Sequence, residues 1–152
     1  GKTILCRKAD AARFTSLADI DEPDVRVMYN PGGPNEAFAK ANLRHADCRI
    51  FAKNVDIPQQ IALGRADVMI TETVEAAFYI RRFPELAAPL IDKPFTHEAF
   101  CVVLSPKCAG MAGAVNRILS ELRASGRLQQ MAQRCIGWSP QANHTESREE
   151  NR

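Results

Sequence analysis

Residues 25–36 read Val-Arg-Val-Met-Tyr-Asn-Pro-Gly-Gly-Pro-Asn-Glu, and this stretch predicts a strand, a tight turn and the start of a helix. Val25, Val27 and Tyr29 recur at every second position, as the residues of one strand face do. The Pro-Gly-Gly that follows requires a turn. Pro34 then suits the first turn of a helix, because that position needs no N–H donor. The segment therefore predicts one β-turn-α unit of an α/β fold.

The same junction is a candidate anion site. A turn that opens a helix leaves the backbone N–H groups of Gly32, Gly33 and Asn35 pointing at one spot, where they can bind a carboxylate or a phosphate. Glu36 complements the positive end of the helix. The alternative is that the turn only connects two elements.

Strands and helices alternate along the rest of the chain. We expect strands at 3–6, 25–30, 49–51, 67–70 and 99–104, and helices at 14–20, 34–45, 56–64, 72–82, 112–124 and 127–136. This order predicts an α/β fold with βαβ units. Asp56 is expected to cap its helix and Gly64 to end it.

The C-terminal third differs from the part before it. In the helix at 112–124, the residues Val115, Ile118, Leu119 and Leu122 form one apolar face. The last residues, 141–152, are polar and mixed in charge, which predicts a disordered tail.

Length and composition narrow the possible functions. At 152 residues and 45% hydrophobic, the chain can form one core or two small lobes. The net charge is +2, and the basic residues are scattered without interleaved aromatic residues, so we expect no nucleic-acid partner. No apolar run reaches the length of a membrane span, so we expect no membrane insertion. No signal peptide precedes Gly1, which leaves the compartment open.

The cysteines and histidines predict no metal site. The five cysteines lie far apart without a C-x-x-C pair, and the three histidines form no ligand cluster. We expect buried free thiols, with one or two disulfides possible in an oxidising compartment. We expect neither a metal nor another cofactor.

Four segments occur in an order that is typical of a known protein class: 1–3, 14–20, 30–36 and 64–76. They resemble the second part of a type II periplasmic solute-binding protein of the amino-acid-binding kind. Within this superfamily, the asparagine turn and the Thr71-Glu-Thr-Val-Glu75 segment resemble cyclohexadienyl (arogenate/prephenate) dehydratase, an enzyme family built on the same fold. The resemblance implies a doubly wound lobe and a periplasmic location.

The resemblance also implies a domain organisation. Residues 1–10 correspond to a crossing strand, 11–92 to the second lobe, and 95–137 to a returning strand and helices. The first lobe, which usually supplies the arginine that binds the ligand carboxylate, has no counterpart. The residues after Pro94 would then lack their usual partner, so we expect them to contact a second copy in a homo-oligomer.

Three residues match positions that the dehydratases place in the cleft. Glu75 would be the acid that protonates a leaving hydroxyl group, while Lys2 and Asn30 would orient the substrate. Each has a structural alternative. Lys2 could be solvated, Asn30 could hydrogen-bond its own backbone in a turn, and Glu75 could face water in the first turn of a helix.

Other candidates concern the identity of the ligand. Glu72 stands where binding-type relatives carry an aspartate for the ligand amine, and its extra methylene could shift the ligand by about one carbon–carbon bond. Pro34 replaces a threonine that would meet the ligand carboxylate. Gln59 could add a hydrogen bond, although it could equally lie at the surface.

The sequence favours a dehydratase-like protein that recognises a small carboxylate or amino acid, such as prephenate or arogenate, and that is inactive without a first lobe. One alternative is a non-catalytic amino-acid-binding module of the ABC-transporter type. Another is a truncated protein that only assembles with other copies.

Overall fold

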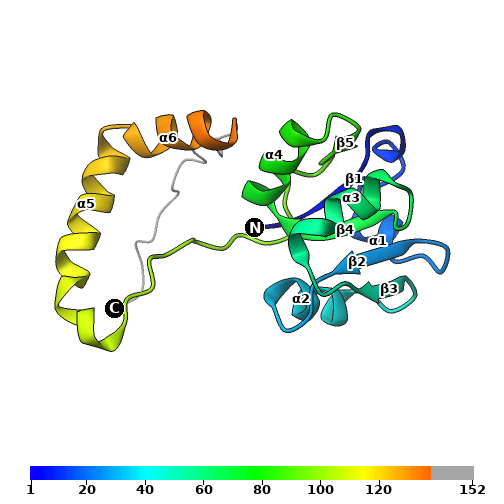
Figure 1. Ribbon diagram of the computed structural model, residues 1–152, viewed down its shortest axis with the longest axis horizontal. Helices are drawn as coiled ribbons and strands as arrows, with labels where there is room; N and C mark the ends of the chain where they lie inside the picture. Colours follow the sequence, from blue (N-terminus) through cyan, green and yellow to red (C-terminus); the bar gives the residue numbers. More distant parts are fainter. Residues whose placement is uncertain (138–152) are drawn as a thin grey trace, which may run out of the picture.

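The computed structural model describes residues 1–137, so the predicted tail at 141–152 lies outside the described residues. The strands are β1 (Lys2–Arg7), β2 (Arg26–Tyr29), β3 (Asp47–Ile50), β4 (Val68–Glu72) and β5 (Leu86–Ala87). The α-helices are α1 (Leu17–Ile20), α2 (Pro34–Asn42), α3 (Ile57–Ala62), α4 (Thr73–Arg82), α5 (Ala112–Ala124) and α6 (Arg127–Ile136). Short 3-10 helices are η1 (Lys8–Asp10), η2 (Asn54–Asp56) and η3 (Pro106–Met111) (Figure 1).

The five strands form one mixed sheet in the order β3-β2-β4-β1-β5. β2 runs parallel to β3 and β4, whereas β1 runs antiparallel to β4 and β5. Because β1 is antiparallel to β4, its first residue, Lys2, lies opposite the last residue of β4, Glu72. The register therefore brings two predicted site residues to the same edge of the sheet.

Helices cover both faces of the sheet. On one face, Val27, Val68 and Ile70 pack with buried residues of α1 and α2, including Ile20 and Ala39. Alternation along a strand sends the intervening side chains to the opposite face.

On that opposite face, Met28 and Met69 pack with Ile57 and Ile61 of α3 and with Tyr79 of α4. Strands buried on both faces are expected to be nearly continuous runs of apolar residues, as Val68-Met-Ile70 is. The arrangement confirms the predicted doubly wound α/β lobe.

Several element boundaries differ from the prediction, and the structure explains two of them, the end of α2 and the start of β3. The helix expected to reach His45 ends at Asn42, because backbone N–H groups after this residue bind another partner instead of helix carbonyl groups. The N–H groups of Arg44, His45 and Ala46 donate instead to Asp21 Oδ1, at 2.7, 2.7 and 3.1 Å. After this connection, β3 begins two residues earlier than predicted: the strand expected at 49–51 spans Asp47–Ile50.

The predicted cap of α3 is also wrong. Asp56 precedes the helix but its side chain makes no capping hydrogen bond. The reason is that η2 runs directly into α3, so Asp56 already has a helical backbone conformation with φ −94° and ψ −13°. Gly64 ends this region with φ +70°, as expected of a glycine after a helix.

We call residues 1–95 the lobe and residues 96–137 the arm. In the arm, the segment predicted as a strand at 99–104 is not one. No strand of the described residues lies beside it, so its backbone groups find no ladder partner, and Phe100 and Val103 are 65% and 87% exposed. A strand requires a neighbour, which sequence alone does not supply.

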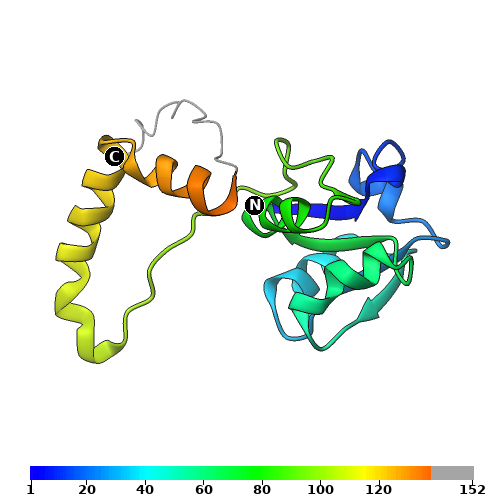
Figure 2. The same cartoon turned by 45° about the horizontal axis from the view of Figure 1, so that its top comes forward.

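The two arm helices have the predicted bounds. Gly126 and Gly137 follow α5 and α6 with φ +69° and +68°, the left-handed conformation that ends helices. Neither helix contains a buried residue. Figure 1 and Figure 2 both show the arm extending away from the lobe, and its return brings the end of α6 beside α4.

The expectation of buried thiols holds for one cysteine. All five are free, but only Cys6 is buried, and Cys48, Cys101, Cys108 and Cys135 are exposed. The last three belong to the arm, which covers none of its own apolar side chains completely. No helix within residues 1–137 combines the length and the apolar character that a membrane span requires.

Candidate functional site

The strand order places a crevice at the carboxyl ends of β2 and β4. These two strands are parallel neighbours, and the helices that follow them, α2 and α4, pack on opposite faces of the sheet. In open α/β sheets, ligands bind where adjacent strands send their helices to opposite sides. The antiparallel β1 adds its first residues to this same edge.

A pocket of about 330 Å³ lies at this edge, near the lower end of the ~300–1,000 Å³ that is usual for ligand sites. Its lining residues are Lys2, Asn30, Pro34, Asn35, Asn54, Glu72, Val74, Glu75 and Phe100. The structure therefore brings together most of the predicted site residues, from three segments that are distant in sequence.

Three predicted site residues do not line this pocket. Gln59 lies exposed on α3, in agreement with the alternative that it is a surface residue. Gly32 and Gly33 belong to the adjoining turn but not to the lining.

Lys2 is buried, with an exposed fraction of 2%, so the alternative of a solvated lysine is wrong. Its ammonium group pairs with Glu72 Oε1. The other oxygen, Glu72 Oε2, lies 3.5 Å from the amine of Gly1. A buried charge requires such compensation. An anionic ligand that approaches Lys2 must therefore compete with Glu72.

Glu75 lies in the first turn of α4, and both of its carboxyl oxygens are held. Thr71 Oγ1 donates to Oε2 at 2.5 Å, and Asn54 Nδ2 donates to Oε1 at 3.2 Å. Both partners are neutral, and no ion pair joins Glu75 to a cation within residues 1–137. The side chain is half-buried and lines the pocket rather than extending into open solvent.

The turn before α2 differs from the prediction in one respect. The N–H of Gly32 is not free, because it donates to Glu36 Oε2 at 2.5 Å. Glu36 also pairs with Lys40 one helical turn later, and the hydrogen bonds from Lys40 and Gly32 lower the pKa of Glu36. The N–H groups of Gly33 and Asn35 make no hydrogen bond in the described structure and remain for a ligand.

The two asparagines that flank this turn contact each other. Asn35 Nδ2 donates to Asn30 Oδ1 at 3.4 Å, so Asn30 does not cap its own backbone as the alternative proposed. Asn35 is only 7% exposed, and its Oδ1 is buried without a hydrogen-bond partner. Both side chains line the pocket.

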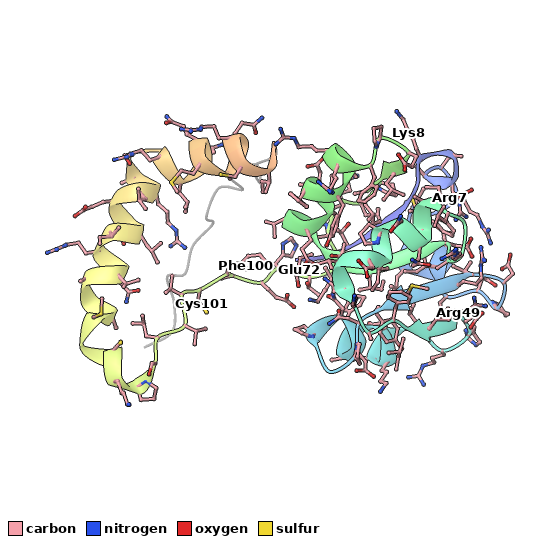
Figure 3. All side chains as sticks on the ribbon, in the orientation of Figure 1. Arg7, Lys8, Arg49, Glu72, Phe100 and Cys101 are labelled. Atoms are coloured by element: carbon pink, nitrogen blue, oxygen red, sulfur yellow. The ribbon has the colours of Figure 1, made fainter. Side chains whose placement is uncertain are left out.

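Sequence reasoning missed two lining residues, Asn54 and Phe100. Asn54 follows β3, a third parallel strand that ends at the same edge, so strand order could have indicated it. Phe100 belongs to the arm, where the sequence predicted only a strand at 99–104 and no role in the site. Figure 3 shows Phe100 and Glu72 where the arm leaves the lobe, and Arg7 on the side of the lobe away from the arm.

Comparisons with known proteins agree with this fold and site. No protein-family model matches the sequence. Cyclohexadienyl dehydratase of Pseudomonas aeruginosa is 39% identical over 130 residues, which are 86% of this chain and 48% of the relative. The chain thus spans about half the length of the curated relative that it matches.

Among solved structures, an ancestral cyclohexadienyl dehydratase is 44% identical with a TM-score of 0.62, over 91% of this chain and 57% of that chain. An ancestral amino-acid-binding protein, described as a precursor of cyclohexadienyl dehydratase, is 28% identical with a TM-score of 0.73, over 90% and 57%.

An arginine-bound substrate-binding protein of an amino-acid ABC transporter from Streptococcus pneumoniae is 22% identical with a TM-score of 0.75, over 90% and 56%, and shows the fold alone. The chain is a homologue of cyclohexadienyl dehydratase and has the fold of the type II periplasmic solute-binding proteins.

Proposed function

We propose that the lobe forms one wall of the ligand site of a dehydratase-like protein that recognises a small carboxylate or amino acid, such as prephenate or arogenate. The observation that carries this proposal is the convergence of Lys2, Asn30, Glu72 and Glu75 on one pocket. The similarity to cyclohexadienyl dehydratase supports the choice of substrate class.

In this proposal, Glu75 donates a proton to the leaving hydroxyl group. The ring carbon–oxygen bond breaks, water leaves, and loss of the ring carboxylate as carbon dioxide supplies the electrons that complete the aromatic ring. Thr71 and Asn54 hold the Glu75 carboxyl group in place. Asn30 and Lys2 orient a substrate carboxylate. For this, the ammonium group of Lys2 gives up its ion pair with Glu72 and pairs with the ligand carboxylate instead.

The proposed organisation has two parts, a second lobe at 11–92 with its crossing strand at 1–10, and a returning segment at 95–137. Enzymes of two-lobed construction act in a closed cleft, where both walls position the substrate and exclude water. We propose that the opposite wall comes from a part equivalent to the unmatched half of the relatives. By the same similarity, we place the protein in the periplasm.

Turnover measurements test this proposal. The 152-residue chain alone should form no phenylpyruvate from prephenate above background. A fusion that adds the unmatched part of the Pseudomonas relative should form it, and Glu75→Gln should abolish that activity. Glu85→Gln is the matched control, because Glu85 is exposed and outside the pocket. Activity that survives Glu75→Gln would remove Glu75 from the mechanism.

A second candidate is a non-catalytic amino-acid-binding module. It is favoured by the similarity to an ancestral amino-acid-binding protein. Isothermal titration distinguishes the two functions, because a binding module takes up amino acids such as L-arginine in the fusion without any turnover of prephenate.

We also propose that the arm contacts a second copy of the chain. None of the residues of α5 or α6 is buried, and Ile118 is 50% exposed, so the apolar face of α5 is only partly covered. Soluble monomers seldom expose a large continuous apolar patch. Sedimentation should show a dimer or larger species that Ile118→Asp shifts toward monomer, whereas the neighbouring Asn116→Asp leaves it unchanged. A monomer at micromolar concentration contradicts this contact.

A further inference from the structure

β3 is an outer strand of the sheet, so within residues 1–137 only one of its two edges is paired. On the paired side, the N–H of Asp47 donates to the carbonyl oxygen of Val25 at 2.9 Å. Parallel pairing uses alternate residues of a strand, so the backbone N–H and C=O groups of Cys48 and Ile50 face the open side. Both residues are exposed, Ile50 by 56%. β3 therefore presents free backbone groups to which another strand can add.

Residues 101–104 have the complementary deficiency. They read Cys-Val-Val-Leu, an apolar run without a charge that is typical of a strand. Within residues 1–137 their backbone groups make no described hydrogen bond, and Val103 is 87% exposed. Figures 1 and 2 show this segment running away from the lobe, and Figure 3 shows Cys101 on it. The segment therefore does not lie against β3 of its own chain.

The open edge and the unpaired segment match in length and in charge. β3 spans four residues, Asp47–Ile50, as does the segment 101–104. Proline and unpaired charges often protect an edge strand from further pairing. β3 contains no proline, and its two charged residues, Asp47 and Arg49, pair with each other. An added apolar strand would place alternate side chains beside Cys48 and Ile50, which share one face of the sheet.

Both halves of this pairing are present in every copy of the chain. In a two-fold dimer, the segment 101–104 of each copy can pair with the β3 edge of the other, so the same contact forms twice. A partner that offered only a strand would complete β3 but would leave 101–104 without hydrogen bonds. A second copy is therefore the occupant that satisfies both halves.

We infer that residues 101–104 of one copy add as a further strand to the β3 edge of a second copy, beside Cys48 and Ile50. This inference rests on the proposed contact between the arm and a second copy. It goes further because it names the surface that receives the arm. That surface belongs to the lobe and lies outside both α5 and the residues that line the pocket.

The first experiment is sedimentation of the full chain together with residue-resolved amide hydrogen exchange. At concentrations where the dimer forms, the amides of Cys48 and Ile50 should exchange at least about tenfold more slowly than in the diluted chain. The amide of Asp47 is the internal control, because it is already bound to Val25 and should exchange alike at both concentrations.

A proline variant tests the backbone contact directly. Ile50→Pro removes one outward N–H and keeps the groups that face β2, which an edge strand tolerates. It should weaken dimerisation at least about tenfold, because an acceptor of the added strand loses its donor. The matched control, Ile50→Ala, keeps the N–H and should weaken dimerisation less. Circular dichroism verifies that each variant is folded.

A cross-link tests the same contact in the unchanged chain. A short bismaleimide should join Cys48 of one copy to Cys101 of the other and give a covalent dimer. This dimer should be lost in Cys48→Ser and in Cys101→Ser but retained in Cys108→Ser. A dimer without a cross-link through Cys48, or without slowed exchange at Cys48 and Ile50, overturns the inference and leaves the proposed ligand site intact. A chain that stays monomeric at micromolar concentration overturns both the inference and the proposed contact between copies.

Discussion

The two edges of the central sheet differ in how completely their polar groups are paired. At the amino edge, Asp67 precedes β4, and its two carboxylate oxygens accept hydrogen bonds from Arg7 and Arg26 at 2.7 to 3.0 Å. At the carboxyl edge, buried oxygens of Asn35 and Asn54 have no donor. The comparison indicates that one edge is built to hold the strands together, and the other is left incomplete for a ligand.

The amino edge connects three strands through one carboxylate. Arg7 ends β1, Arg26 begins β2, and Asp67 stands before β4. Burial raises the pKa of Asp67, but the hydrogen bonds from Arg26 and Arg7 outweigh it and hold that pKa well below its usual range. The charged form of Asp67 is therefore stabilised by folding.

The largest expected effect follows from breaking this edge. Asp67→Asn should lower the free energy of unfolding by about 3 kcal/mol, because two arginines lose their shared, mostly buried partner. Urea denaturation measures the loss. Asp47→Asn is the matched control, since Asp47 pairs with Arg49 at the surface, where an ion pair contributes less than about 1 kcal/mol. Equal losses in the two variants would show that the Asp67 network does not hold the strands.

A smaller effect concerns the stability of the fold at acidic pH. Burial raises the pKa of Asp21, but the backbone N–H groups of His45, Ala46 and Arg44 outweigh it and lower that pKa to about 2. A carboxyl group whose pKa is lower in the folded than in the unfolded state stabilises the fold above its unfolded pKa, near 4, and loses this contribution as the pH falls through its folded pKa.

The free energy of unfolding should therefore be level above about pH 5 and should fall between about pH 4 and pH 2. Chemical denaturation as a function of pH measures this slope, which Asp21→Asn should make shallower. An unchanged slope in that variant would assign the acid sensitivity to other carboxyl groups, first of all to Asp67.

The smallest expected effect is at the carboxyl edge. Glu75→Gln should change the free energy of unfolding by less than about 1 kcal/mol, because the partners of Glu75 are neutral donors and the side chain is half-buried. Thermal unfolding of the variant beside Asp67→Asn gives the comparison directly. A loss at Glu75 as large as that at Asp67 would mean that both edges stabilise the fold alike.

The lobe was largely predictable because its signals are local. The alternation in 25–29 and the apolar run at 68–70 specify strands, and glycine at position 64 ends a helix. The end of α2 was not predictable, since it depends on Asp21, which binds the N–H groups of residues 44–46 from a distance in sequence.

The candidate site was predictable in part. Resemblance indicated Lys2, Asn30 and Glu75, and the structure places all three at one pocket. It could not indicate that Glu36 occupies the N–H of Gly32, because that contact depends on a side-chain conformation. The strand prediction at 99–104 was wrong for another reason. The apolar pattern is that of a strand, but the described residues contain no neighbouring strand for it to pair with.

The most direct test of the central claim is nuclear magnetic resonance titration of the full chain with arogenate and with prephenate. The account predicts that the ligand shifts the side-chain amide signals of Asn30, Asn35 and Asn54, while the backbone amides around Asp67 at the opposite edge stay unchanged. Shifts confined to the amino edge or to the arm, with the three asparagine amides unmoved at saturation, would contradict the assignment of the ligand to this pocket.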